Sequence, residues 1–471
     1  MTVDNPGEAM TDRELSELVE LLRALIRIKS VNPPGDEILV ARYLEQLFVD
    51  EGLEPTVVEP FPGRGSIVAR VRGDGTGGEP LLLLSHLDVV PADPAGWTHD
   101  PFGGDLADGY VWGRGAIDMK SMVAMEAQVM RRLARAAREA GRNPAQDPIP
   151  GLRRDVIFCS TADEEAGGWH GANWLVNEHP DWLRAAGALN EAGGISMTFG
   201  GACFYPIQVA EKGFVVYKIN VKGRWGHGSV PTPDNAAVLA AQVVARVAEP
   251  GRARLTEPIK VSLARAIPHL VAHGSGAVSA AMRVATRFRP GLVAAGARRV
   301  GDPVMARTIA AITHDTVSVG IVQAGVKYNV IPGTAYIELD CRTLPGTDEP
   351  AMRAELRRRI GEELWARLDV ECEQVGAAVS APLTGPLYPL LEQVLRDHDP
   401  DAVPIPFLAP FATDAKHLAR IGVPTYGFSP LKTGPADGLL ALMHGDDERV
   451  AVEALRFGLP VLTDAVMRFC G

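Results

Sequence analysis

Carboxylate and imidazole side chains follow several apolar runs of this chain. His86 and Asp88 come directly after the run Leu81–Leu84, and residues two apart on an extended chain face the same way. The imidazole could therefore bind a metal while the carboxylate holds its other nitrogen, as metal-bound histidines usually require. A histidine and an aspartate at this spacing are also common on surfaces, so the pair gains weight only from further ligands.

Four further segments offer such ligands: Asp118, Asp163–Glu165, Glu191 and His444. Asp118 alone would be read as a helix N-cap, and the acidic triplet alone as solvated charge. Adjacent side chains diverge, however, so one carboxylate of the triplet can bind a metal while its neighbour faces a water molecule. Two histidines and three carboxylates suit two zinc ions, with one imidazole and one carboxylate on each metal and the last carboxylate between them.

Strands and helices must bring these side chains together. Apolar runs predict strands at 67–71, 81–85 and 156–160, and helical patterns are found at 12–28, 37–51 and 121–140. Continuous apolar strands that alternate with helices indicate an α/β fold with a mixed, mostly parallel sheet flanked by helices. Nearly every candidate ligand follows a predicted strand, and active sites of open sheets form at that end.

A second module is predicted from Glu211 onward. Its elements follow the order strand, helix, strand, strand, helix, strand, at 214–221, 235–248, 316–323, 334–341, 349–364 and 369–373. This order is that of a ferredoxin-like α+β module. We therefore expect a catalytic domain of residues 1–208 and 377–471, interrupted by an inserted lid domain of residues 209–376.

The predicted lid carries an unusual basic stretch, residues 251–312. It holds nine arginines and one lysine against Glu257 and Asp302. One interpretation is a helical elaboration with solvated arginines. The other is a surface for lipid-like acyl chains, an anionic membrane or an acidic partner.

Composition excludes several classes of protein. The net charge of −11 argues against a nucleic-acid binder. The chain start lacks the features of a signal peptide, and no apolar run approaches the ~20 residues that cross a bilayer. Five scattered cysteines without a Cys-x-x-Cys pair favour a reducing, cytoplasmic location.

Four segments, in order, resemble the aminoacylase/carboxypeptidase family of zinc metallohydrolases: Ser85–Pro91, Gly113–Lys120, Asp163–Glu165 and Asn190–Glu191. That family includes carboxypeptidase G, carboxypeptidase S, succinyl-diaminopimelate desuccinylase and aminoacylase. The apolar insert before Ala324 and the sequence around Trp169 most resemble the carboxypeptidase S and N-fatty-acyl amino acid hydrolase branch. The resemblance implies cleavage of an amide bond in N-acyl amino acids or small peptides with a free carboxylate.

The resemblance also implies a role for each matching position. His86 and Glu191 would bind one zinc ion, Glu165 and His444 the other, and Asp118 would bridge them, with cobalt or manganese as substitutes. Glu164 would be the general base, and Asp88 would support catalysis beside His86.

Substrate contacts are implied at four further positions. His227, in Gly226–Ser229, would reach the scissile carbonyl, often from the partner subunit of a homodimer formed through the lid. Asn329, Arg342 and Thr413 would bind the small-molecule substrate. Ala412 stands where the family has a glycine, which puts the backbone before Thr413 in doubt.

Two alternatives compete with a metal-dependent amide hydrolase. Ser429 and Lys432 fit the Ser-x-x-Lys pattern of serine amidases, and Lys432 also begins a Lys-Thr-Gly sequence. One lysine would then have to serve both motifs. The second alternative is a catalytically silent binding protein of the same fold, which usually lacks a ligand or the base, whereas here every expected position is filled.

Overall fold

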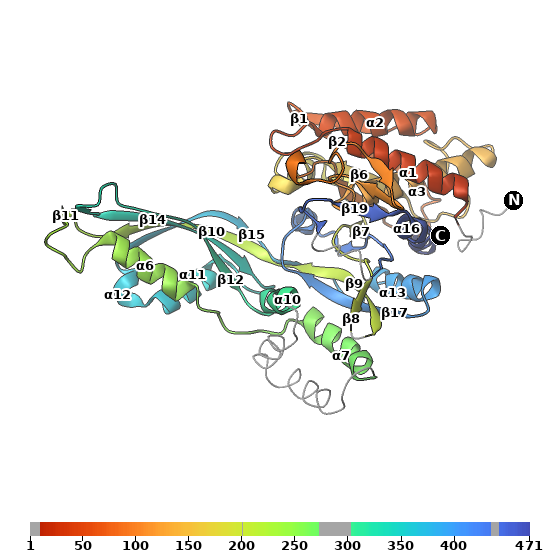
Figure 1. Ribbon diagram of the computed structural model, residues 1–471. Helices are drawn as coiled ribbons and strands as arrows, with labels where there is room; N and C mark the ends of the chain where they lie inside the picture. Colours follow the sequence, from red (N-terminus) through yellow and green to blue (C-terminus); the bar gives the residue numbers. More distant parts are fainter. Residues whose placement is uncertain (1–9, 200, 273–302, 435–441) are drawn as a thin grey trace. The chain divides into compact units, whose positions relative to one another are not determined.

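The computed structural model describes residues 10–199, 201–272, 303–434 and 442–471 (Figure 1). The chain forms two compact units, which we call the first and the second unit. The first comprises the described residues of Met1–Val209, Ala381–Phe407 and Thr413–Gly471, and the second those of Ala210–Ser380 and Leu408–Ala412.

The first unit is built on a mixed sheet with a parallel centre. In spatial order its strands are β1 (Thr56–Phe61), β2 (Arg64–Val71), β6 (Val156–Thr161), β3 (Leu81–His86), β7 (Gly187–Asn190), β18 (Thr425–Gly427) and β9 (Ala202–Glu211). The neighbours β6, β3, β7 and β18 are parallel, whereas β1, β2 and β9 pair antiparallel. Strands β8 (Met197–Phe199) and β17 (Ala402–Ala409) also pair with β9.

Side chains of β3 alternate between two hydrophobic cores, which explains its continuous apolar sequence. Leu81 and Leu83 pack in one core, and Leu82 and Leu84 pack in the other. The first core includes α1 (Asp12–Arg27), α2 (Glu37–Asp50), α3 (Lys120–Glu139), α13 (Leu387–His398) and α16 (Val452–Cys470). The second includes α4 (Ala172–Glu178), α5 (Pro180–Leu183) and α14 (Ala415–Leu418). Each buried leucine contributes about 1.5–3 kcal/mol, so both layers hold the strand in register.

A small antiparallel sheet joins two segments that are far apart in the sequence. It consists of β4 (Asp105–Ala107), β5 (Tyr110–Trp112) and β19 (Arg449–Ala451). Arg449 pairs with Trp112, and the Gly113 N–H donates to the Glu448 carbonyl at 2.9 Å. The segment after β5 therefore lies beside the segment before β19.

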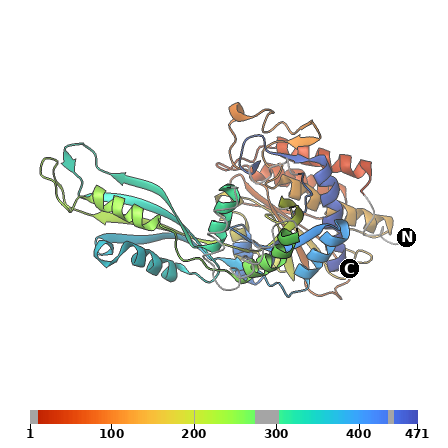
Figure 2. The same cartoon turned by 60° about the horizontal axis from the view of Figure 1, so that its bottom comes forward.

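The second unit contains a four-stranded antiparallel sheet in the order β12 (Thr316–Ala324), β14 (Thr334–Thr343), β10 (Gly213–Lys222) and β15 (Leu368–Gly376). Helices α6 (Ala236–Val247) and α11 (Glu349–Ile360) lie side by side on one face (Figures 1 and 2). The predicted helix at 349–364 is divided, because Gly361 has φ of 84° and α12 (Glu362–Trp365) begins after it. Strands β11 (Gly226–His227) and β13 (Val330–Ile331) form a separate two-stranded antiparallel sheet.

Part of the basic stretch 251–312 lies outside the described residues, namely 273–302. Its ends form α7 (Glu257–Ala272) and α10 (Pro303–Thr313), and Ile259 and Ile267 are buried. Both interpretations of this stretch therefore stay predictions. Among the described helices, none combines the length and the apolar character needed to cross a bilayer.

Candidate metal centre

Five predicted ligands form two overlapping groups in the first unit. Donor atoms of His86, Asp118 and Glu191 lie within 4.8 Å of one another, and so do those of Asp118, Glu165 and His444. Asp118 belongs to both groups, since its Oδ1 lies 3.1 Å from His86 Nε2 and its Oδ2 lies 3.1 Å from His444 Nε2. A carboxylate that reaches both groups with separate oxygens can bridge two cations.

The two sheets of the first unit bring these residues together. Strand β3 ends at His86, Glu191 follows β7, and the acidic segment Asp163–Glu165 follows β6. These three strands are parallel neighbours, so their carboxyl ends meet at one edge of the sheet. Asp118 and His444 come from the segments that the small sheet places side by side.

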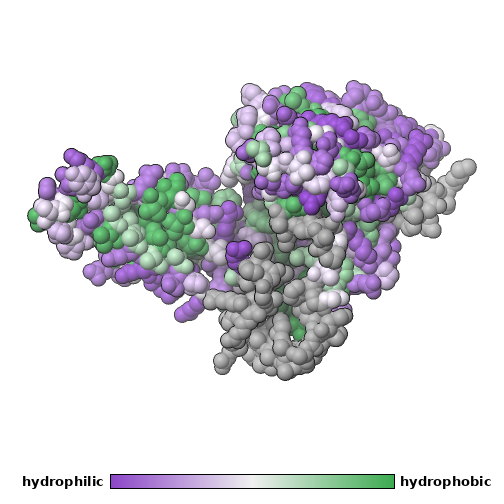
Figure 3. Space-filling model, in the orientation of Figure 1, coloured by the Kyte–Doolittle hydropathy of each residue, from purple (hydrophilic) through white to green (hydrophobic). Residues whose placement is uncertain are grey.

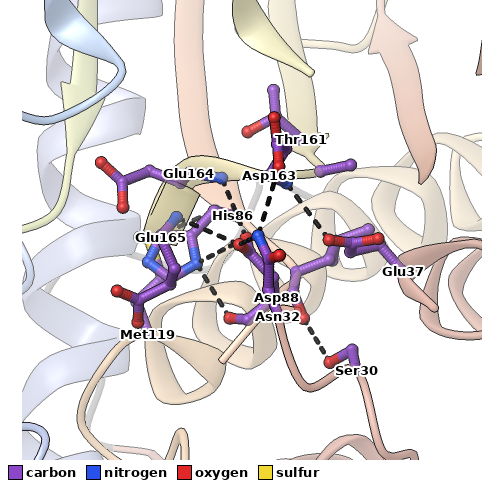
Figure 4. Close-up of polar contacts among 12 residues, drawn as sticks. Ser30, Asn32, Glu37, His86, Asp88, Met119, Thr161, Asp163, Glu164 and Glu165 are labelled. Carbon is purple, nitrogen blue, oxygen red and sulfur yellow. Dashed lines mark hydrogen bonds and ion pairs between the residues drawn. The ribbon is translucent and has the colours of Figure 1, made fainter. Parts of the chain in front are cut away.

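Asp88 is fully buried and holds the backbone of the acidic segment (Figure 4). Its Oδ1 accepts the Glu164 N–H at 3.1 Å, and its Oδ2 accepts the Glu165 N–H at 3.0 Å. The sequence led us to expect this carboxylate on His86 Nδ1. That nitrogen lies nearer the Asp88 carbonyl oxygen, at 3.0 Å, than Oδ1, at 3.4 Å. His86 thus turns Nδ1 to Asp88 and leaves Nε2 toward Asp118.

Glu448 fixes the backbone at Asp118. Its Oε1 accepts the N–H groups of Ile117 and Asp118 at 2.7 and 3.1 Å, and its Oε2 accepts from the Arg114 guanidinium at 2.7 Å. No pattern in the sequence pointed to Glu448 or Arg114. The only available signal was that each lies in a segment that carries a predicted ligand.

The carboxylates of this centre need compensating positive charge. Burial raises the pKa of Glu191 to about 7, and the negative charges of Asp118 and Glu165 add to this rise while His86 opposes it. Burial and the charge of Glu191 also raise the pKa of Glu164 well above its usual range. In the described chain, Oε1 of Glu165 is buried without a hydrogen-bond partner, which is costly for a carboxylate. The donor set therefore fits two divalent cations.

The other predicted site residues belong to both units. Thr413, in the first unit, accepts a hydrogen bond from Asn190 Nδ2 at 3.1 Å, directly beside Glu191. His227 and Asn329 lie in the second unit, where the Gly228 N–H donates to the Asn329 carbonyl at 2.8 Å. Arg342, also in the second unit, donates to both carboxylate oxygens of Asp340, at 2.8 and 3.1 Å, and lies over the ring of Phe214.

The serine-amidase alternative lacks its catalytic pair. The ammonium of Lys432 forms an ion pair with Asp399 at 2.9 Å. Ser429 is buried, and its N–H donates to the Gly193 carbonyl at 2.7 Å. In the part of the chain that the structure describes, no hydrogen bond joins Ser429 to Lys432.

Known proteins resemble this chain in sequence and in fold. Residues 82–468 match the model of peptidase family M20/M25/M40. Aminoacylase-1 of Sus scrofa is 27% identical over 454 residues, which cover 94% of this chain and 93% of the relative. The N-fatty-acyl-amino acid synthase/hydrolase PM20D1 of Xenopus tropicalis is 25% identical over 465 residues, with coverages of 95% and 84%. The M20 family metallo-carboxypeptidase Sso-CP2 from Sulfolobus solfataricus has a TM-score of 0.69 at 15% identity, covering 98% of this chain and 99% of its own. The predicted fold class and the family resemblance are thereby confirmed.

Proposed function

Because the chain belongs to peptidase family M20/M25/M40 and is therefore a hydrolase of amide bonds, we propose that it cleaves N-acyl amino acids or small peptides with a free carboxylate beside the scissile bond. The observation that carries the proposal is the pair of ligand groups that share Asp118, with Glu164 next to them. The names of the two relatives, aminoacylase and N-fatty-acyl-amino acid synthase/hydrolase, support this substrate class.

We propose zinc as the metal. His86 and Glu191 would hold one ion, Glu165 and His444 the other, and Asp118 both. Cobalt or manganese could substitute, since mixed nitrogen and oxygen ligands do not exclude them. Two such cations make hydroxide available from water near neutral pH and offset the negative charge that develops on the scissile carbonyl.

Glu164 is the proposed general base. Its backbone is held by Asp88, but no hydrogen bond holds its carboxylate among the described residues. Figure 4 shows the carboxylates of Glu164 and Glu165 pointing in different directions. Glu164 can therefore accept a proton from the attacking water and pass it to the leaving nitrogen, while Glu165 stays with His444 at 3.2 Å.

The substrate-side assignments are part of the proposal. The Arg342 guanidinium would release Asp340 and bind the substrate carboxylate instead. Asn329 and Thr413 would also contact the substrate. His227 would act from a second copy of the chain. A homodimer is supported by α6, over which hydrophobic side chains gather in Figure 3 and where Val238 is 49% exposed.

We place the enzyme in the cytoplasm. Its five cysteines are all free, which suits a reducing compartment.

The test is a panel of N-acyl amino acids that varies acyl length and amino acid, each compared with its amide and methyl ester. Hydrolysis of the acids, with poor cleavage of the amides and esters, is expected. Equal rates on acids and amides would show that the proposed substrate class is too narrow, and no cleavage of any acid would overturn it.

A further inference from the structure

A buried polar cluster lies beside the acidic segment Asp163–Glu165. It includes three residues that neither bind the proposed metals nor contact the proposed substrate: Asn32, Glu37 and Arg64. Asn32 lies in the turn between α1 and α2, Glu37 begins α2, and Arg64 begins β2. Asn32 is 5% exposed and Glu37 is fully buried. Buried polar groups such as these are costly unless they are hydrogen-bonded, so their partners define what they do.

Asn32 connects two anionic side chains, Asp88 and Asp163, to one cationic side chain, Arg64. Its Nδ2 donates to Asp88 Oδ2 at 2.8 Å and to Asp163 Oδ1 at 3.3 Å. Its Oδ1 accepts from the Arg64 guanidinium at 2.9 Å. A side-chain amide offers a donor and an acceptor at once, whereas an ionised carboxylate at this position could only accept. The residue type therefore matches its surroundings.

Arg64 and Glu37 hold the other side of this cluster. The Arg64 guanidinium donates to Glu37 Oε1 at 2.6 Å and lies 3.4 Å from Asp163 Oδ1. Glu37 Oε1 also accepts the Asp163 N–H at 3.3 Å. Asp163 has φ of 72°, in the left-handed region that is strained for a residue other than glycine. These contacts compensate for that strain at the start of the acidic segment.

We propose that Asn32 is a positioning residue that acts through Asp88, an inference that rests on the proposed function. Asn32 donates to Oδ2, the oxygen that also accepts the Glu165 N–H, while Oδ1 accepts the Glu164 N–H. Asn32 thereby fixes the plane of the Asp88 carboxylate. That plane sets the backbone from which the proposed general base, Glu164, and the proposed metal ligand, Glu165, diverge. Arg64 keeps the amide of Asn32 in its orientation.

A double-mutant cycle tests this inference. Asn32→Ala is made in the native chain and in Asp88→Ala, and metal affinity is measured by competition with a chelator, alongside kcat and KM. In the native background, Asn32→Ala should lower the affinity for the less tightly bound metal ion by about ten- to a hundredfold, and kcat by a similar factor. This is the effect of losing a hydrogen bond to a charged group. KM should change far less. In the Asp88→Ala background the same change should have almost no further effect on metal affinity.

If Asn32→Ala lowers metal affinity by the same factor in the native chain and in Asp88→Ala, the inference is overturned. Equal effects would mean that Asn32 acts independently of Asp88, as a merely structural residue would. Arg64→Gln decides the question if Asn32→Ala does not fold, and it should move metal affinity in the same direction by a smaller factor. Asn220→Ala, at an exposed position of β10, is the matched control and should change nothing. Metal binding is read without substrate, so a protein that binds metals but cleaves no N-acyl amino acid refutes the proposed function alone.

Discussion

Glu164 and Glu165 are neighbours in the sequence, yet their side chains have different surroundings. Glu165 contacts His444, whereas no hydrogen bond holds the Glu164 carboxylate in the described chain. Glu164→Gln should therefore keep both metals and the substrate affinity, while turnover falls by ~10² or more, the scale of general-base catalysis. Glu165→Gln should instead weaken metal binding. Metal analysis and steady-state kinetics on both variants check this, and exchanged phenotypes would reverse the assignment.

Arg342 offers a second test at the scale of single residues. Its ion pair with Asp340 is partly exposed, and such pairs contribute at most ~1 kcal/mol to stability, so Arg342→Ala should fold normally. If Arg342 binds the substrate carboxylate, the preference for an N-acyl amino acid over its amide should fall about ten- to a hundredfold. Arg357→Ala, which removes an exposed ion pair with Glu362 on the same unit, is the control. An unchanged preference in Arg342→Ala would mean that Arg342 is structural.

The sequence pointed to the five candidate ligands because each follows a strand or lies in a distinctive short segment. It did not point to Asn32, Arg64 or Glu448. Their roles depend on contacts between segments that are distant in the chain, and no local pattern encodes such contacts. Asn32, in a Val-Asn-Pro-Pro-Gly sequence, looks only like a turn residue.

At the scale of elements, long periodic segments were predictable and short ones were not. Strand β3 and helices α1 and α3 could be placed to within one or two residues, because burial on both faces or on one stripe leaves a clear pattern. Strands β11, β13 and β18 have two or three residues each, too few to show a period. The break at Gly361 was missed because a glycine within a helical pattern does not by itself show that it takes a positive φ.

Lys212 links elements of the second unit and makes their stability depend on pH. Its ammonium donates to the carbonyls of Ala311 and His314 and to the Thr316 hydroxyl, at 2.9–3.0 Å. Burial lowers its pKa from 10.5 to about 8. The unfolded chain therefore binds more protons between these values, and the free energy of unfolding should rise with pH across that window.

In the Lys212→Met variant, the free energy of unfolding should not rise with pH in this way. Urea unfolding followed by circular dichroism should show the native chain gaining roughly 1–3 kcal/mol relative to the variant between about pH 7.5 and pH 10. Below about pH 7, roughly one unit under the folded-state pKa, Lys212 is charged in both states and the cost of its burial is fully present, so the difference should be flat there. Parallel pH profiles for the two proteins would show that Lys212 titrates normally.

At the scale of the whole molecule, His227 is proposed to act from a second copy of the chain. Mixing inactive His227→Ala with inactive Glu164→Gln should then restore part of the activity, because a hybrid dimer contains one site with both residues intact. The mixture is assayed against each variant alone, with sedimentation to establish the oligomeric state. A fully active monomer, or no recovery from hybrid dimers, would refute a role across subunits.

Five residues, namely Asp118 and the four other ligands that it connects, are proposed to bind two metal ions that hydrolysis requires. The most direct measurement is the metal content of the purified protein together with its activity on an N-acyl amino acid, before and after a strong chelator. We expect about two divalent ions per chain, as a two-metal site holds, loss of activity with the metal, and recovery on adding zinc, cobalt or manganese. Full activity in metal-stripped protein would contradict the account.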